Sequence, residues 1–531
     1  LEFRRVLFRS KKLYEYDQPA IMKKKINYNP DYKPNIVVFV LDDADKKISP
    51  IFEAMPFAFQ LFKNNGTDFT NAFTSTSYCC PARCQIFTGM YGHNNGVTSM
   101  YGNHASIKAF RMPLHSNGTR QINPHNKKYI NNEFRTLNIN LQNIGYTTHA
   151  VGKFINGIEN DHTSQIDYVP PGWDTFNIGA DHFMYTGYRY SLTNWKKGDT
   201  KISYEWHGTK EEDYITDIIA KKSVNIIKNT NDKPFFLYIA PTCPHVPIGP
   251  ANRHKDKMSY WSSQYDKYVT NRPNFNAELK NKPYWLRKTE TRRDEFFNSE
   301  LDWTRLDWTR RMSSLYACDD LIRDVYNEID KKGQLNNTVF MLASDNGYNL
   351  FAHKQNNKQS ANEESMNVLL YISGKDFEKN VTDDQLALLI DIAPTIYDIL
   401  GYETMEYVDG YSLLTKRKRS AVLFQYKNKD FHDEMDNLHN SPELLNLGKI
   451  APEQLLYDVP PFTAIRTTTH VFIEYYNTSE INENEYELYN LISDPYQLEN
   501  IYTNHTDEFV KNLSSRLRQL EKCSGYECVY I

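Results

Sequence analysis

A cysteine and an arginine stand four residues apart in the segment Cys79-Cys80-Pro81-Ala82-Arg83. Proline suits the first turn of a helix, so the segment predicts a loop-to-helix junction with Cys79 at the start of the helix. The positive end of a helix favours an anion, and Arg83 could hold a negative group beside the Cys79 side chain. On its own, this pattern is more often a buried structural cysteine with a surface arginine. Its meaning therefore depends on the polar groups that share the site.

Two pairs of oxygen-bearing side chains each follow an apolar run that is typical of a buried strand. Asp42 and Asp43 follow one run, and Asp345 and Asn346 follow another. The carboxyl ends of parallel strands meet at one edge of a sheet, so the two pairs are expected to lie together. Either pair alone would more often be a solvated turn or a cap. Together they indicate a site for a hard divalent cation, with calcium (Ca2+) the favoured ion.

Three further ionisable side chains fall next to these elements. Lys153 directly follows a predicted strand, His245 lies in a proline-braced loop after another, and Lys358 lies beyond the second pair of metal-ligand candidates. A lone lysine is usually a solvated surface charge, and a lone histidine is more often structural. Beside an anion site, however, the ammonium groups would pair with anionic oxygens, and the histidine is a candidate proton donor to a leaving group.

Strand and helix patterns alternate along most of the chain, which predicts an α/β fold with a sheet covered on both faces. Strands are predicted at 35–41, 147–151, 235–240 and 339–343, and helices at 213–227, 312–329 and 385–400. The polar, aromatic and weakly periodic stretch 250–297 predicts a long loop over a pocket.

The pattern changes beyond Gly401. The segments 462–476 and 485–492 are typical of extended structure, and 508–520 is typical of a helix. We therefore predict a smaller C-terminal α+β domain that contains an antiparallel sheet. At the other end, residues 1–10 are arginine-rich and unlike the rest of the chain, so they could be non-native or the remainder of a removed leader.

The composition describes a large folded protein with no general affinity for nucleic acid. A chain of 531 residues, 40% of them hydrophobic and 14% aromatic, can bury a large core. Its formal net charge of -4 excludes the global basic field that nonspecific nucleic-acid binders use. No apolar run approaches the roughly 20 residues of a membrane span. An anionic ligand must therefore be bound by a local cationic pocket.

Cysteines and glycosylation sequons bear on the compartment. Seven cysteines are too few for a disulfide framework, but Cys523 and Cys528 could close a small ring in an oxidising compartment. We favour this disulfide over two free or buried thiols. Seven N-x-S/T sequons are compatible with secretion, although an Asn-rich chain produces several by chance. They begin at Asn65, Asn117, Asn336, Asn380, Asn477, Asn504 and Asn512.

Taken together, these residues resemble the formylglycine-dependent sulfatase family, and within it the branch of N-acetylglucosamine-6-sulfatases and extracellular heparan endosulfatases. The first motif fits the C-x-P-x-R sulfatase signature. The similarity runs from about Pro34 to the tail. Its other motifs include Pro34-Asn-Ile-Val-Val-Phe-Val-Leu-Asp-Asp43, Gly152-Lys-Phe-Ile-Asn156, Pro244-His-Val-Pro247, Ser344-Asp-Asn-Gly-Tyr348 and Asp391-Ile-Ala-Pro-Thr395.

The resemblance implies an alkaline-phosphatase-like α/β fold, with a mixed sheet flanked by helices, and hydrolysis of a sulfate ester. The expected substrate is the 6-O-sulfate of N-acetylglucosamine or glucosamine units in glycosaminoglycans or related sulfated glycans. The family further implies that a formylglycine-generating enzyme oxidises Cys79 to formylglycine, whose hydrated aldehyde offers one hydroxyl for attack and another for release. The implied location is lysosomal or secreted.

The same resemblance assigns the site residues. Calcium would be held by Asp42, Asp43, the formylglycine oxygen at Cys79, Asp345 and Asn346. Arg83 would stabilise the hydrate. Lys153, His245 and Lys358 match the family's positions that bind the sulfate and act on the leaving group. The implied domains are an N-terminal extension at 1–33, a catalytic sulfatase domain at 34–405 and a C-terminal subdomain at 406–531.

Three positions depart from the family pattern. No histidine follows Gly152-Lys153 in the way common to many sulfatases, Asn349 stands where the branch usually has histidine, and Ala82 replaces the usual serine of the modification motif. These changes bear on the substrate and on the conversion of Cys79.

The alternatives to a glucosamine-6-sulfatase are a sulfatase for another carbohydrate or small molecule, a phosphoester or phosphonate hydrolase, and an inactive glycan-binding homologue without formylglycine.

Overall fold

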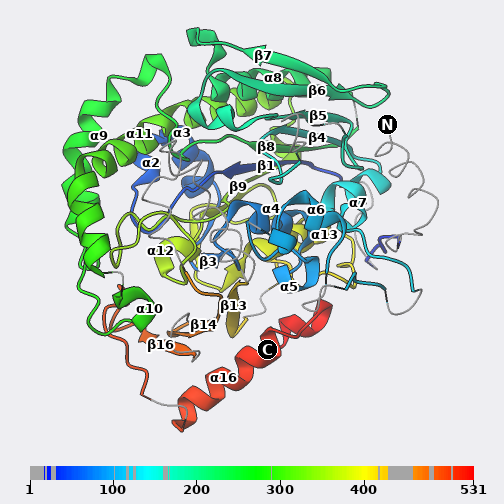
Figure 1. The fold of residues 1–531 in the computed structure, drawn as a ribbon. Coiled ribbons are helices and arrows are strands. Elements are labelled where there is room, and N and C mark those ends of the chain that lie inside the picture. Colours follow the sequence, from blue (N-terminus) through cyan, green and yellow to red (C-terminus); the bar gives the residue numbers. More distant parts are fainter. Residues whose placement is uncertain are drawn as a thin grey trace, which may run out of the picture.

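The computed structural model places the chain around a ten-stranded sheet (Figure 1). It describes residues 17, 21–25, 32–100, 102–114, 119–123, 127–158, 166, 168–231, 233–288, 290–415, 419–427, 459–476, 484–503 and 506–531. The strand order is β11-β2-β10-β9-β1-β8-β4-β5-β6-β7. These strands are β1 (Asn35–Leu41), β2 (Thr67–Phe69), β4 (Thr147–Gly152), β5 (Thr175–Ile178), β6 (Tyr190–Lys196), β7 (Ser203–His207), β8 (Phe235–Ala240), β9 (Thr338–Ser344), β10 (Leu370–Ser373) and β11 (Val381–Asp383).

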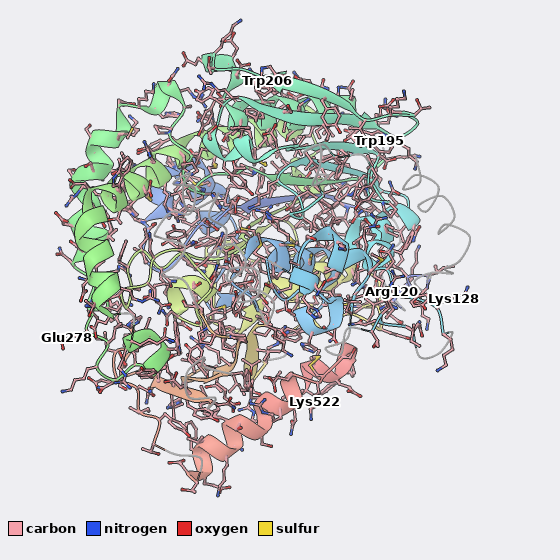
Figure 2. All side chains as sticks on the ribbon, viewed as in Figure 1. Arg120, Lys128, Trp195, Trp206, Glu278 and Lys522 are labelled. Atoms are coloured by element: carbon pink, nitrogen blue, oxygen red, sulfur yellow. A yellow bond between two sulfur atoms is a disulfide. The ribbon has the colours of Figure 1, made fainter. Side chains whose placement is uncertain are left out.

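The centre of the sheet is parallel and its flanks are mixed. β1 pairs with β9 along its length, so that Leu41 lies opposite Ser344, and β4 pairs with β8, so that Gly152 lies opposite Ala240. β1 and β8 are also parallel, whereas β10, β6 and β7 pair antiparallel with their neighbours. The outer β6–β7 hairpin exposes Trp206 at the rim of the molecule (Figure 2). The mixed sheet is as predicted, and the carboxyl ends of β9, β1, β8 and β4 lie along one edge.

Helices cover both faces of this sheet (Figure 1). One face is covered by α4 (Cys79–Thr88), α7 (Leu137–Asn143) and α13 (Ile392–Ile399), and the other by α8 (Ile215–Asn229) and α11 (Glu290–Lys331). The shorter helical segments are α2 (Ile51–Ala54), α3 (Pro56–Ala58), η1 (Phe59–Asn64), α5 (Gly92–Asn95), η2 (Gly102–His104), α6 (Ser106–Arg111), η3 (Asn132–Arg135), η4 (His182–Thr186), η5 (Glu211–Asp213), η6 (Asn252–His254), α9 (Lys257–Tyr265), η7 (Asp266–Thr270), α10 (Tyr284–Arg287), η8 (Leu335–Asn337), α12 (Glu363–Met366) and η9 (Leu389–Asp391).

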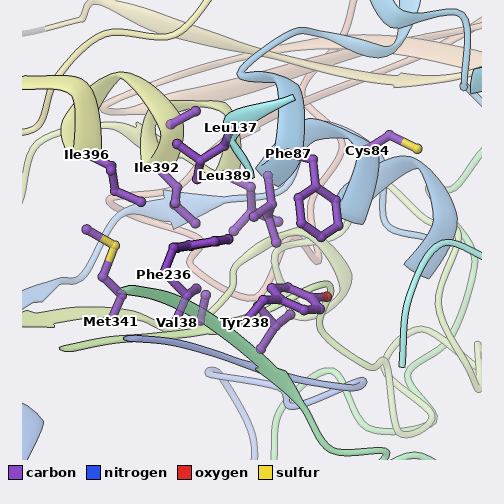
Figure 3. Close-up of a cluster of buried hydrophobic side chains, with 14 of the residues drawn as sticks. Val38, Cys84, Phe87, Leu137, Phe236, Tyr238, Met341, Leu389, Ile392 and Ile396 are labelled. Atoms are coloured by element: carbon purple, nitrogen blue, oxygen red, sulfur yellow. The ribbon is translucent and has the colours of Figure 1, made fainter. Parts of the chain in front are cut away.

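The apolar run in β1 is continuous because the strand is buried on both faces. Val38 belongs to the hydrophobic cluster on one face, and its neighbour Val37 belongs to the cluster on the other. Successive side chains of a strand point to opposite faces, so a strand covered on both sides needs apolar residues at every position. Figure 3 shows Val38, Phe236 and Met341 from three neighbouring strands packed beneath Ile392 of α13.

The C-terminal part forms a second, antiparallel sheet against which a helix packs. Its strands are β13 (Ala421–Tyr426), β14 (Phe462–Thr467), β15 (His470–Tyr475) and β16 (Glu485–Asn490), followed by α16 (Glu508–Leu520) and η11 (Gly525–Val529). Leu513 and Leu517 of α16 are buried, and the predicted Cys523–Cys528 disulfide follows the helix. A separate two-stranded sheet is formed by β3 (Ala72–Phe73) and β12 (Ala387–Leu388). The boundaries at residues 33 and 405 stay predictions.

Most predicted elements of the main sheet are confirmed, but the stretch 250–297 was wrongly predicted to be a loop. It contains α9, η7 and α10, and α11 begins within it. The side chains of Trp261 and Tyr265 are buried against α11, where Trp308 lies edge-on to Trp261 at a ring distance of 5.7 Å. Because a few large aromatic side chains bury most of this surface, the segment shows little apolar periodicity in its sequence.

Two predicted helices have different bounds in the structure. The helix predicted at 312–329 is part of α11, which begins at Glu290 and packs on α9 around Thr304 and Trp308. The helix predicted at 385–400 begins only at Ile392. Before it, Ala387 and Leu388 pair with β3, and the Asp391 carboxylate accepts the N–H of Leu388 at 2.7 Å, which ends the extended segment.

Candidate active site

The side chains singled out in the sequence converge at the carboxyl ends of four adjacent parallel strands. Asp42 and Asp43 follow β1, and Asp345 and Asn346 follow β9. Lys153 follows β4 directly, and His245 lies in the loop after β8. Since these strands lie side by side in the order β9-β1-β8-β4, residues more than 300 positions apart are brought within hydrogen-bonding distance.

Cys79 is the first residue of α4 and points at the acidic pair. Tyr78, before it, is extended, and the helix runs to Thr88. The Cys79 sulfur lies 3.4 Å from Oδ1 of Asp42, and the Lys358 ammonium group donates to it at 3.0 Å. The predicted loop-to-helix junction is therefore present, and it sets a sulfur between a carboxylate and a cation.

Arg83 lies one helical turn after Cys79 and is wholly buried. Its Nε and Nη2 both donate to Oδ2 of Asp345, at 3.1 and 2.8 Å, and its Nη1 donates to the Tyr238 hydroxyl at 2.9 Å. The other oxygen of Asp345 accepts the backbone N–H of Asp43 at 3.0 Å. Asp345 thus ties α4 to the ends of β1 and β9.

Each of the two lysines pairs with one carboxylate of the acidic pair. Lys153 Nζ lies 2.6 Å from Asp42 Oδ2, and Lys358 Nζ forms an ion pair with Asp43. Burial alone would raise the pKa of Asp42, but the Lys153 ammonium group holds it well below its usual range. Burial would likewise lower the pKa of Lys358, but Asp43 raises it. Burial raises the pKa of the Cys79 thiol well above its ordinary value.

His245 marks the open side of the site. Its side chain is 23% exposed, whereas the neighbouring Asp43 side chain is 1% exposed. The Nε2 atom lies 3.5 Å from Asp43 Oδ2, and Nδ1 contacts the backbone oxygen of Val246. Burial lowers the pKa of His245. Among the predicted site residues, His245 is therefore the one that solvent reaches most.

The structure brings together part of the predicted metal-ligand set, whereas Asp345 lies outside the candidate group found among the described residues and is engaged by Arg83. One ligand atom each from Asp42, Asp43, Cys79 and His245 lie within 4.8 Å of one another. Asn346 donates through Nδ2 to Asp43 at 2.7 Å, while its Oδ1 is buried and has no hydrogen-bond partner within the described parts of the chain. A buried oxygen without a donor is unfavourable unless a cation or water meets it. His245 belongs to this group by distance, although the sequence motif predicted that it would act as a proton donor.

The long helix α11 holds two loops of the site, which the sequence did not indicate. Arg311 is buried and donates to the backbone oxygens of Asp43, at 2.6 Å, and Pro244, at 3.2 Å. About two turns later on α11, Cys318 forms a disulfide with Cys243. Both contacts join residues more than 60 positions apart, so no local pattern could reveal them. Together they fix the loop that carries His245.

Comparison with known proteins identifies this arrangement. The family model described as Sulfatase matches residues 34–402. The chain belongs to the sulfatase family. It is therefore a sulfuric ester hydrolase by family, as the motifs predicted.

Individual relatives support the same assignment. Human N-acetylglucosamine-6-sulfatase is 27% identical over 511 residues, which cover 93% of this chain and 86% of the relative. A solved structure described as being in complex with its substrate, D-glucosamine-2-N,6-O-disulfate, has a TM-score of 0.67 and 20% identity over 92% of this chain and 98% of its own. The phosphonate monoester hydrolase of Agrobacterium radiobacter has a TM-score of 0.59 and 14% identity over 93% and 96%. At such identities the structural likeness shows the fold alone, and the predicted alkaline-phosphatase-like architecture is confirmed.

None of the described helices combines the length and apolar character needed to cross a membrane. The sequons at Asn65, Asn336, Asn380 and Asn512 are exposed, and those at Asn117, Asn477 and Asn504 lie outside the described residues.

The contacts of Arg311 predict that Arg311→Met destabilises the protein. The change removes the donor for two buried carbonyl groups and an ion pair with the buried Asp45 carboxylate at 3.2 Å. Breaking such a buried pair costs about 3 kcal/mol. We expect a lower free energy of unfolding, measured by denaturant or thermal unfolding.

Arg310→Met is the matched control. Arg310 is partly exposed, and its ion pair with Asp307 is 3.8 Å long. Such a surface pair contributes about 0.5 kcal/mol or less. Equal unfolding free energies for the two variants would contradict the role of Arg311.

Proposed function

We propose that this chain removes the 6-O-sulfate of N-acetylglucosamine or glucosamine units in glycosaminoglycans or related sulfated glycans. The observation that carries the proposal is the similarity to N-acetylglucosamine-6-sulfatase through 93% of the chain. The buried cluster of Cys79 with three cationic side chains supports it, because a sulfate ester is an anion and the molecule as a whole carries a net charge of -4.

Cys79 is proposed to be converted to formylglycine by a formylglycine-generating enzyme. Once formed, the hydrated aldehyde would supply the hydroxyl that attacks sulfur. The side chain at position 79 would lie at the start of α4, where the helix N-terminus and Lys358 favour negative charge. Arg83 is anchored by Asp345 and would orient that group from one helical turn away.

The remaining polar side chains are proposed to bind the sulfate group and to protonate the leaving oxygen. Lys153 and Lys358, now paired with Asp42 and Asp43, would bind the sulfate oxygens. His245, on the open side of the site, would donate a proton to the leaving oxygen of the sugar. This protonation matters because a sugar alkoxide is a poor leaving group.

Calcium is the proposed metal. Its ligands would be Asp42, Asp43, Asp345, Asn346 and the oxygen formed at Cys79. The partnerless Oδ1 of Asn346 and the carboxylates beside it support a cation that prefers oxygen. Bound there, the ion would supply positive charge close to the reacting group.

We infer that the protein works in a lysosomal or secreted compartment. The Cys243–Cys318 and Cys523–Cys528 disulfides support an oxidising route of folding, and the exposed sequons fit it.

The substrate proposal predicts preferential sulfate release from glucosamine 6-sulfates. The measurement is a screen of defined mono- and oligosaccharides that carry sulfate at different positions, with the matched 6-phosphate sugar as control. The fold is shared with a phosphonate hydrolase, so this control also tests the rival activity. Faster release of phosphate than of sulfate would favour that rival, and turnover of another sulfate position alone would replace the substrate.

The nucleophile proposal predicts that Cys79→Ala abolishes sulfate release while the fold survives. Loss of a nucleophile lowers kcat by about a thousandfold or more. Cys84→Ala is the control, because Cys84 lies in the same helix but packs in the hydrophobic cluster. Peptide mass spectrometry of the native protein should find formylglycine at position 79. A wholly unmodified thiol would instead indicate an inactive glycan-binding homologue.

The metal proposal predicts that chelation lowers activity and that calcium restores it. Oxygen ligands favour calcium over zinc, which binds nitrogen and sulfur more readily. Sulfate release is measured before chelation, after it, and after adding each ion. Recovery with zinc but not with calcium would refute the oxygen-ligand site.

A further inference from the structure

Tyr185 lies against two of the side chains proposed to act on the substrate, although no motif singled it out. Its ring lies 4.5 Å from the His245 ring, centroid to centroid, at an angle of 38°. The Lys153 ammonium group lies 5.0 Å from the centre of the same ring. Tyr185 is half-buried, so its side chain reaches from the open side of the site to Lys153.

The segment that carries Tyr185 is held firmly in place. Tyr185 lies in η4, where the Asp181 side chain accepts the N–H of Phe183 at 3.0 Å and that of Ser191, in β6, at 2.9 Å. The Thr242 hydroxyl donates to the backbone oxygen of Met184 at 3.4 Å, which ties η4 to the loop of His245. The backbone next to Tyr185 is therefore linked directly to the loop that carries His245.

Tyr185 covers one side of Lys153 and one side of His245, where it can limit the movement of both side chains. Lys153 has a long, flexible stem, and its ammonium group is drawn to Asp42 at 2.6 Å. Within the described part of the chain, the polar contacts of His245 are that of Nδ1 with Val246 and the 3.5 Å approach of Nε2 to Asp43. The aromatic face of Tyr185 limits the movement of both groups, through ring packing and through attraction between a cation and a π system.

We propose that Tyr185 is a positioning residue that orients His245 toward the leaving oxygen and Lys153 toward the sulfate group. This inference rests on the proposed roles of His245 and Lys153 in sulfate ester hydrolysis. Proton donation requires the donor within hydrogen-bonding reach of the leaving oxygen, so a freely turning imidazole would protonate it less often. The Tyr185 ring supplies that restraint through its contacts with the His245 ring and the Lys153 ammonium group.

Three variants separate the parts of this role. Tyr185→Leu removes the ring, Tyr185→Phe keeps the ring and removes the hydroxyl, and Phe183→Leu is the matched control in the same helical segment. Phe183 is 60% exposed. Thermal unfolding of all three checks that the fold is retained.

The decisive measurement is kcat/KM on a series of phenyl sulfates whose leaving phenols differ in pKa. Esters with acidic phenols need little help from a proton donor, whereas esters with weakly acidic phenols need it most. Tyr185→Leu should therefore lose little activity on the former and about tenfold or more on the latter. Tyr185→Phe should stay within about threefold of wild type on both, and Phe183→Leu should match wild type.

A uniform loss by Tyr185→Leu across the series would overturn the proposal, because a merely structural role does not depend on the leaving group. Unchanged activity of that variant would overturn it as well, as would equal loss by Tyr185→Phe. The substrate proposal fails separately, when wild type hydrolyses phenyl sulfates but leaves glucosamine 6-sulfates intact.

Discussion

Charge balance in a buried space is the constraint on which this structure depends. Three carboxylates and three cationic side chains share the carboxyl ends of the central strands, and each carboxylate has its own partner. The pairs are Asp42 with Lys153, Asp43 with Lys358, and Asp345 with Arg83. A single unpaired charge at this depth would cost several kcal/mol, so the site is stable only as a complete set. The same balance leaves cations next to the Cys79 side chain, where an anionic ester would be bound.

This balance requires elements that are distant in the chain to end at the same place. The parallel pairing of β9, β1, β8 and β4 brings the three carboxylates together with Lys153, and α4 adds Cys79 and Arg83. A second set of contacts holds these elements from outside. Arg311 and the Cys243–Cys318 disulfide fix the loops after β1 and β8 to α11, and Tyr78, before Cys79, packs within the cluster of the C-terminal sheet.

The parts that could be predicted from sequence are those whose physics is local. The strand 235–240 and the helix 508–520 were predicted with the bounds that the structure has. A strand buried on both faces has a continuous apolar run, and a helix buried along one stripe has apolar residues at helical spacing, so both patterns are visible in the sequence. The stretch 250–297 lacked such a pattern, since a few aromatic side chains bury α9 and α10. The first half of α11 was missed because its contacts with α9, at Thr304 and Trp308, join residues about 40 positions apart.

The residue types of the site and the family of the chain could be recognised without a structure, because the motifs keep their order and lie at the ends of recognisable strands. Folding establishes how those residues pair, that the side-chain oxygen of Asn346 has no hydrogen-bond partner among the described residues, and that Arg311 and Tyr185 lie beside them. The reason is distance along the chain: these contacts join residues tens to hundreds of positions apart, and only the packing of the sheet against its helices brings them together.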